Sequence, residues 1–108
     1  MLGKIVTITV DRPMGSFHPE HPDLFYPVNY GYIPGTVAGD GEEEDVYILG
    51  VDHPVSIFTG QLIAKLHRRD DVEDKWVVAP EGTSFSDEQI RAAVHFQEQY
   101  FHSNIRLL

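Results

Sequence analysis

The sequence predicts a mainly β (α+β) domain in which a small, strongly twisted sheet or partly closed barrel packs against one C-terminal helix. Two observations lead to this prediction. Runs of β-branched and aromatic residues separated by bends with proline and glycine fill the first 80 residues, and a helical period replaces them after residue 86. At 108 residues the chain has the size of one domain, so we expect residues 1–108 to form a single domain with one core.

Composition narrows the class of protein. Hydrophobic residues make up 42% and charged residues 23%, which is typical of a folded chain. The net charge of −9 repels nucleic acid, and the lack of cysteine leaves only oxygen or imidazole ligands for any metal. The first ten residues alternate in polarity, so we expect no signal peptide, no membrane span and a cytoplasmic location.

The first half of the chain predicts two strands and a loop-rich segment between them. Residues 4–10 are rich in β-branched side chains and predict a strand. Residues 11–23 contain three prolines and a glycine, which predict a long loop. In residues 24–44 two prolines flank the aromatics, so we expect short extended pieces between bends, followed by a strand over 45–52.

The second half predicts a hairpin and then the helix. Residues 60–69 and 75–80 are extended runs, and the polar segment 70–74 has the length of a hairpin loop. Beyond them, Ser86 and Gln89 form the pattern of a capping box, and the apolar residues that follow recur at helical spacing.

An acidic stretch leads into the strand predicted over 45–52. Five of the six positions 40–45 carry a carboxylate. Like charges this close disfavour one another's ionisation unless a cation lies among them. Two interpretations follow, a divalent metal site or a solvated acidic turn. Glu43 and Glu44 fit the solvated turn, because charged side chains ordinarily stay in water.

A second acidic loop suggests where a metal would bind, because loops at strand ends can converge on one site. Alternation along residues 45–50 predicts that Asp45 points into the barrel mouth. Ligation by oxygen alone suits Mg²⁺ or Mn²⁺, and Mg²⁺ commonly completes its shell with substrate phosphate, which predicts a phosphate compound as substrate. The candidate carboxylates of the two loops are Asp40, Glu42, Asp45, Asp70, Asp71 and Asp74.

Cations and aromatic residues border these loops. Lys75, Arg68 and Arg69 lie beside the second acidic loop, either to bind phosphate or to form surface salt bridges within the loop. In residues 25–32, Tyr26 and Tyr32 fit either core packing or a phenolic wall that donates to phosphate.

Four blocks occur in a familiar order over residues 25–101: "FYPVNYGYIPGT", "DGEEED" before "VYILG", "DDVEDK" before "WVVAP", and "VHFQEQY". In this the chain resembles the soluble inorganic pyrophosphatases of the Mg²⁺-dependent, OB-like barrel family. The resemblance implies a small OB-like barrel, a homo-oligomer and inorganic diphosphate as substrate.

The resemblance also implies site residues. Asp45 would bridge metal ions and, with Glu42 as acceptor of a proton from the attacking water, would be catalytic. The implied metal ligands are Asp40, Asp45 and Asp74, with Asp70 or Asp71 as the fourth aspartate. The residues implied to contact phosphate or to support the site are Arg12, Tyr30, Lys75 and Tyr100.

The sequence therefore predicts hydrolysis of inorganic diphosphate to two phosphates by water that Mg²⁺ activates. The sequence departs from the family pattern at Phe101, where the family has a lysine. This departure supports alternative functions. The alternatives are a slow or non-catalytic module that binds Mg²⁺ with diphosphate or a nucleotide, and a hydrolase of a larger diphosphate compound. Oligonucleotide binding would rest on the OB-like shape alone, and the charge opposes it.

Overall fold

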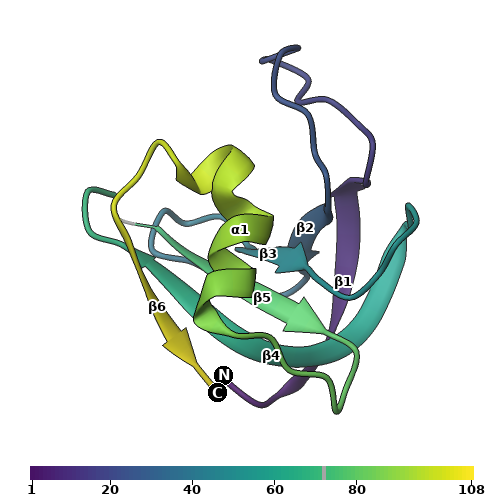
Figure 1. Ribbon diagram of the computed structural model, residues 1–108, viewed down its shortest axis with the longest axis vertical. Coiled ribbons are helices and arrows are strands. Elements are labelled where there is room, and N and C mark those ends of the chain that lie inside the picture. Colours follow the sequence, from purple (N-terminus) through teal and green to yellow (C-terminus); the bar gives the residue numbers. More distant parts are fainter. Residues whose placement is uncertain (72) are drawn as a thin grey trace.

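The computed structural model describes residues 1–71 and 73–108, which form a strand-rich body with one helix against it (Figure 1). The elements run in the order β1 (Ile5–Arg12), β2 (Asn29–Ile33), β3 (Glu44–Ile48), β4 (Ile57–Arg68), β5 (Asp74–Ala79), α1 (Asp87–Glu98) and β6 (Ser103–Leu107). No helix among the described residues combines the length and the apolar character that a membrane crossing requires.

Five strands close into a barrel, which confirms the predicted fold class. The sheet runs β1-β2-β3-β5-β4, and a further pairing between β1 and β4 closes the ring. All neighbours are antiparallel except β3 and β5, which run parallel and place Asp45 beside Lys75. Strand β6 pairs with the second half of β4 outside the ring.

Strand β4 is long enough to pair with three other strands. Its residues 57–61 pair with β1, residues 61–67 pair with β5 across a register irregularity between Leu62 and Ala64, and residues 64–68 pair with β6. Such irregularities bend a strand, as closure of a small barrel requires. The chain ends meet here, since Gly3 N–H donates to Leu62 O and Leu108 N–H to Ile63 O.

Glycine at position 31 is a steric requirement for this barrel. A Cβ built on Gly31 would lie 2.0 Å from the carbonyl oxygen of Thr9, on the facing strand. Any side chain there would push β1 and β2 apart, so the close approach of these strands depends on glycine.

Two hydrophobic clusters fill the molecule, one inside the barrel and one between the barrel and α1. The alternation of β3 separates them, because Val46 and Ile48 join the inner cluster while Tyr47 and Leu49 join the cluster beneath α1. Asp45 shares the face of Tyr47 and Leu49, as predicted. That face is the outer one beneath α1, so Asp45 does not point into the barrel mouth.

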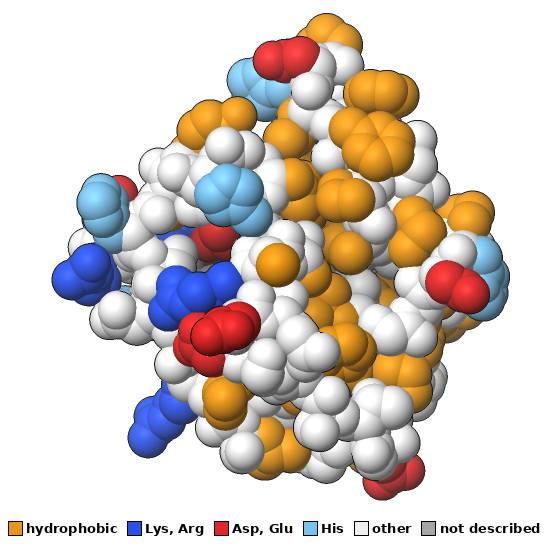
Figure 2. Space-filling model, in the orientation of Figure 1, with side chains coloured by type: hydrophobic (Ala, Val, Ile, Leu, Met, Phe, Trp, Pro, Cys, Tyr) orange, Lys and Arg blue, Asp and Glu red, His pale blue; other side chains and the backbone are white. Residues whose placement is uncertain are grey.

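Helix α1 begins where the sequence predicts. Ser86 Oγ accepts from Gln89 N–H at 3.1 Å and Gln89 Oε1 accepts from Ser86 N–H at 2.8 Å, which confirms the capping box. Ile90 and Val94 bury the apolar side of the helix. In the view of Figure 2, hydrophobic side chains form a band on one side of the helix, and charged side chains gather on the other side, toward β6.

Candidate functional site

A cavity of about 660 Å³ opens beside the C-terminal end of α1. Its walls come from five parts of the chain: the end of β1 with the loop that follows, strand β2, the paired starts of β3 and β5, the end of β4, and the end of α1 with the turn after it. Cationic, acidic and phenolic side chains line this wall together, so the cavity is the candidate functional site.

Lys75 lies at the floor of this cavity with two carboxylates. Only 5% of its side chain is exposed, and Nζ donates to Asp45 Oδ2 at 2.5 Å and to Glu73 Oε1. Burial opposes the charge of Lys75, but Tyr30 and Asp45 outweigh burial and raise its pKa. Lys75 is therefore a fixed cation with a carboxylate on each side.

Glu73 is the residue that sequence reasoning missed. It precedes β5 and lines the cavity, and burial followed by the neighbouring Asp45 carboxylate raises its pKa. The period of two along β5 could have found it, because Glu73 and Lys75 are two positions apart and share a face.

Asp74 lies outside the cavity, on the other face of β5. Its carboxylate is 2.7 Å from His67 Nδ1 and 3.2 Å from Lys65 Nζ. Burial opposes its ionisation, but these two contacts hold its pKa below the usual value. Asp74 therefore has its partners on β4, and Glu73, rather than Asp74, contacts Lys75.

The other predicted acids also lie off the cavity wall. Asp40 and Glu42 are exposed in the turn before β3, where Asp40 Oδ1 accepts from Glu42 N–H at 3.0 Å. Asp70 Oδ1 accepts from His102 N–H at 3.2 Å, and Asp71 Oδ2 lies 3.4 Å from Arg68 Nη1. Of the carboxylates predicted as metal ligands, Asp45 alone lines the cavity.

The carboxylates fit a metal ion only in part. Within residues 1–71 and 73–108, no three histidine, aspartate or glutamate side chains are grouped to hold a metal ion. Asp45 and Glu73 do face one Lys75 ammonium group in the cavity. Because Mg²⁺ is commonly held by one or two carboxylates together with water and substrate phosphate, this pair suits a metal shared with a phosphate ligand, not an all-protein cage.

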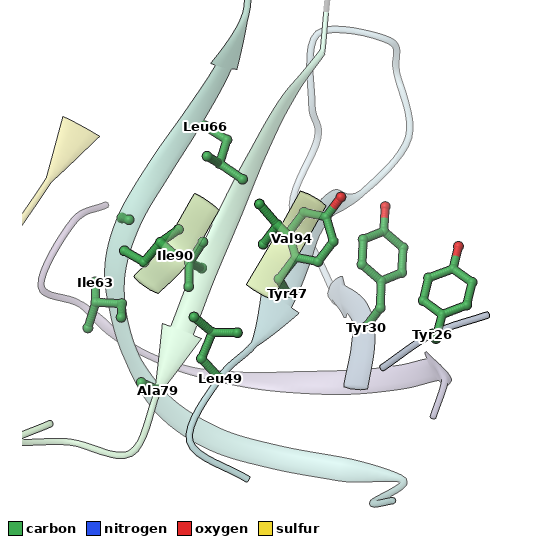
Figure 3. Close-up of a cluster of buried hydrophobic side chains, with 11 residues drawn as sticks. Tyr26, Tyr30, Tyr47, Leu49, Ile63, Leu66, Ala79, Ile90 and Val94 are labelled. Carbon is green, nitrogen blue, oxygen red and sulfur yellow. The ribbon is translucent and has the colours of Figure 1, made fainter. Parts of the chain in front are cut away.

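Tyr26, Tyr30 and the end of α1 form the wall beside Lys75, and Tyr47 is buried behind them. Figure 3 shows Tyr47, Tyr30 and Tyr26 in a row with their hydroxyl groups toward the same side. Tyr26 Oη donates to Gln97 Oε1 at 2.9 Å, and Gln97 Nε2 donates to Tyr47 Oη at 2.7 Å. Burial raises the pKa of Tyr30, so its phenol stays a neutral donor. Tyr26 and Tyr30 thus serve both as core and as wall.

Arg12 brings a polar atom that lacks a partner. Its Nε is buried without a hydrogen-bond partner among the described residues, while Nη1 is 3.5 Å from Asp11 Oδ2. Arg12 lines the cavity, and a buried donor without an acceptor is costly. An oxygen-rich anion in the cavity would satisfy it. Tyr100, which is 70% exposed, lies at the same wall.

The fold and this wall define the class as a closed, five-stranded barrel with one helix and a cavity lined by cationic, acidic and phenolic side chains. Solved structures share that fold. The inorganic pyrophosphatase of Ehrlichia chaffeensis superimposes with a TM-score of 0.73 at 22% identity over 99% of this chain and 88% of that one. The protein of Coxiella burnetii superimposes with a TM-score of 0.67 at 18% identity over 99% and 86%.

Sequence comparison identifies the family. The family model described as inorganic pyrophosphatase matches residues 4–102, so this chain belongs to the inorganic pyrophosphatase family. The Saccharolobus solfataricus inorganic pyrophosphatase is 33% identical over 109 aligned positions, which cover 86% of this chain and 60% of the relative. The Caulobacter vibrioides enzyme is 34% identical over 64 positions, which cover 56% and 34%. The chain thus spans between a third and three fifths of the length of these two relatives.

Proposed function

We propose that this protein hydrolyses inorganic diphosphate to two phosphates with a divalent metal ion, Mg²⁺ or Mn²⁺, as cofactor. The observation that carries the proposal is the cavity, where Lys75 lies between Asp45 and Glu73 and where Arg12, whose Nε has no partner among the described residues, also lines the wall. Membership in the inorganic pyrophosphatase family supports the choice of substrate.

Each residue of the floor has a distinct task. Lys75 and Arg12 bind phosphate oxygens and neutralise their charge, and the Tyr30 phenol donates a hydrogen bond to them. Asp45 and Glu73 are the carboxylates that would hold the metal ion, which lowers the pKa of a water ligand and stabilises the leaving phosphate. The roles predicted for Asp40, Glu42, Asp70, Asp71 and Asp74 stay predictions, since these side chains lie off the cavity wall.

Phosphate release from inorganic diphosphate tests the proposal directly. We expect release with Mg²⁺, weaker or comparable release with Mn²⁺, and none after a chelator removes the metal. The control adds Mg²⁺ back in excess of the chelator, which should restore the rate. Folded protein that binds diphosphate with Mg²⁺ but releases no phosphate would contradict the proposal and select the binding module. Faster release from a nucleoside diphosphate would select the larger substrate.

Glu73 and Asp74 are neighbours in sequence, but Glu73 lines the cavity and Asp74 lies off it, on the other face of β5. We expect Glu73→Gln to lower kcat/KM about tenfold or more, because it removes a charge from the cavity floor. Asp74→Asn should change kcat/KM less than about threefold, because its partners are His67 and Lys65. Steady-state phosphate release measures both. A larger loss in Asp74→Asn would instead support the ligand role that the family resemblance implies for Asp74.

A homo-oligomer and a cytoplasmic location belong to the same proposal. The band of hydrophobic side chains beside α1 offers a surface for contact between copies (Figure 2). The absence of cysteine is compatible with a reducing compartment.

A further inference from the structure

Arg68 is a buried cation of the cavity wall that the proposed reaction does not yet use. It ends β4, its side chain is 4% exposed, and it lines the cavity together with Glu73 and Lys75. The next residue, Arg69, is exposed and lies off the wall. Two adjacent arginines thus differ in burial and in access to the cavity.

One edge and one face of the Arg68 guanidinium are fixed. Nε donates to Glu98 Oε1 at 3.1 Å and Nη2 donates to Glu98 Oε2 at 2.6 Å, which is the two-pronged geometry that orients arginine most firmly. Glu98 is itself held by the hydroxyls of Tyr47, at 2.6 Å, and Ser103, at 3.0 Å. The Phe101 ring covers one face, with its centroid 3.7 Å from Arg68 Cζ.

The contacts of the remaining nitrogen, Nη1, with residues that the structure describes are long. It is 3.4 Å from Asp71 Oδ2 and 3.9 Å from Glu73 Oε2, beyond the usual 2.7 to 3.2 Å of an N–H···O bond. Glu73 uses its other oxygen, Oε1, to accept from Lys75. Arg68 and Lys75 therefore lie on two sides of one carboxylate, and Nη1 keeps donor capacity toward the cavity.

We propose that Arg68 is a substrate-binding residue that donates from Nη1 to a phosphate oxygen, with Glu98 and Phe101 as positioning residues. The inference rests on the proposed function for the substrate, and its geometry is that of the Arg68 contacts in this chain. A phosphate with one oxygen on Lys75 and another on Arg68 would be held at two fixed points, and arginine suits such an oxyanion better than a point charge does. The competing role is a purely structural tie between β4 and α1.

Binding of imidodiphosphate, a non-hydrolysable analogue of diphosphate, separates the two roles. Titration calorimetry on the whole chain would compare wild type with Arg68→Lys and with the matched control Arg69→Lys, and each variant would be checked for KM, kcat and melting temperature. Lysine keeps a charge beside Glu98 but cannot bridge Glu98 and a ligand together. We expect Arg68→Lys to raise Kd and KM about tenfold or more, and Arg69→Lys to leave both within about twofold of wild type.

The outcomes are distinct. A lower melting temperature in Arg68→Lys with wild-type Kd and KM would make Arg68 structural and overturn the inference, while the proposed function would stand on wild-type phosphate release. No binding and no release by wild type would overturn both. If Arg68→Lys does not fold, Phe101→Leu repeats the test, because it keeps the ion pair with Glu98 and removes the ring that fixes the guanidinium plane. It should weaken binding about threefold, and an unchanged Kd would again overturn the inference.

Discussion

Replacing Asp45 with asparagine is expected to lower kcat/KM for inorganic diphosphate by about 10²- to 10³-fold. Asp45 Oδ2 is 2.5 Å from Lys75 Nζ, and the two residues are register partners on the parallel strands β3 and β5. Asparagine keeps the shape of the side chain and an acceptor for Lys75 but removes the negative charge that the proposed metal ion needs. The fold should therefore survive while the rate falls.

Steady-state phosphate release at saturating Mg²⁺ is the measurement, with the melting temperature as a check on folding. Asp40→Asn is the matched control, because it makes the same chemical change in the exposed turn before β3. The structure predicts a loss below about threefold for this control. Equal losses in the two variants would mean that the turn reaches the reacting phosphate and that Asp40 acts as the family resemblance implies.

Replacing Glu98 with alanine is expected to lower the free energy of unfolding by about 3 to 5 kcal/mol. Glu98 is 8% exposed and binds Arg68 through two nitrogens and Tyr47 through its hydroxyl. Its removal leaves a buried guanidinium without its counter-charge, which costs more than the loss of an exposed pair. Denaturant unfolding at neutral pH measures the change. The control is Glu88→Ala on the exposed side of α1, which should cost less than about 1 kcal/mol.

The loss of stability in Glu98→Ala should be smaller at acid pH than at neutral pH. Burial opposes ionisation, but the bonds from Arg68 and Tyr47 outweigh it and lower the pKa of Glu98 below its ordinary value of 4.5. A lowered folded-state pKa contributes stability that is fully present above pH 4.5 and is lost as the pH falls through the folded-state pKa. The difference between wild type and Glu98→Ala should therefore shrink at acid pH. A difference that is constant down to pH 2 would contradict the ion pair as its cause.

Local patterns were sufficient for the elements whose causes are local. β-branched runs predicted β1, β3, β4 and β5 to within a few residues, and the capping box predicted the start of α1. Strand β6 was missed, because "SNIRL" is short and mostly polar and is extended only through its pairing with β4. Closure of the barrel could not be predicted from local patterns either, because the pairing of β1 with β4 joins residues about 50 positions apart.

The sequence by itself determined the mainly β class, the C-terminal helix, the family and the presence of Asp45, Lys75, Tyr30 and Arg12 among the candidates. Only the tertiary structure decided which neighbours of these residues face the cavity. It selected Glu73 over Asp74 and Arg68 over Arg69, and it placed Glu98 behind Arg68 from 30 positions away. The physical reason is that adjacent residues on a strand point to opposite faces, and which face carries the site is decided by the segments that pack on it.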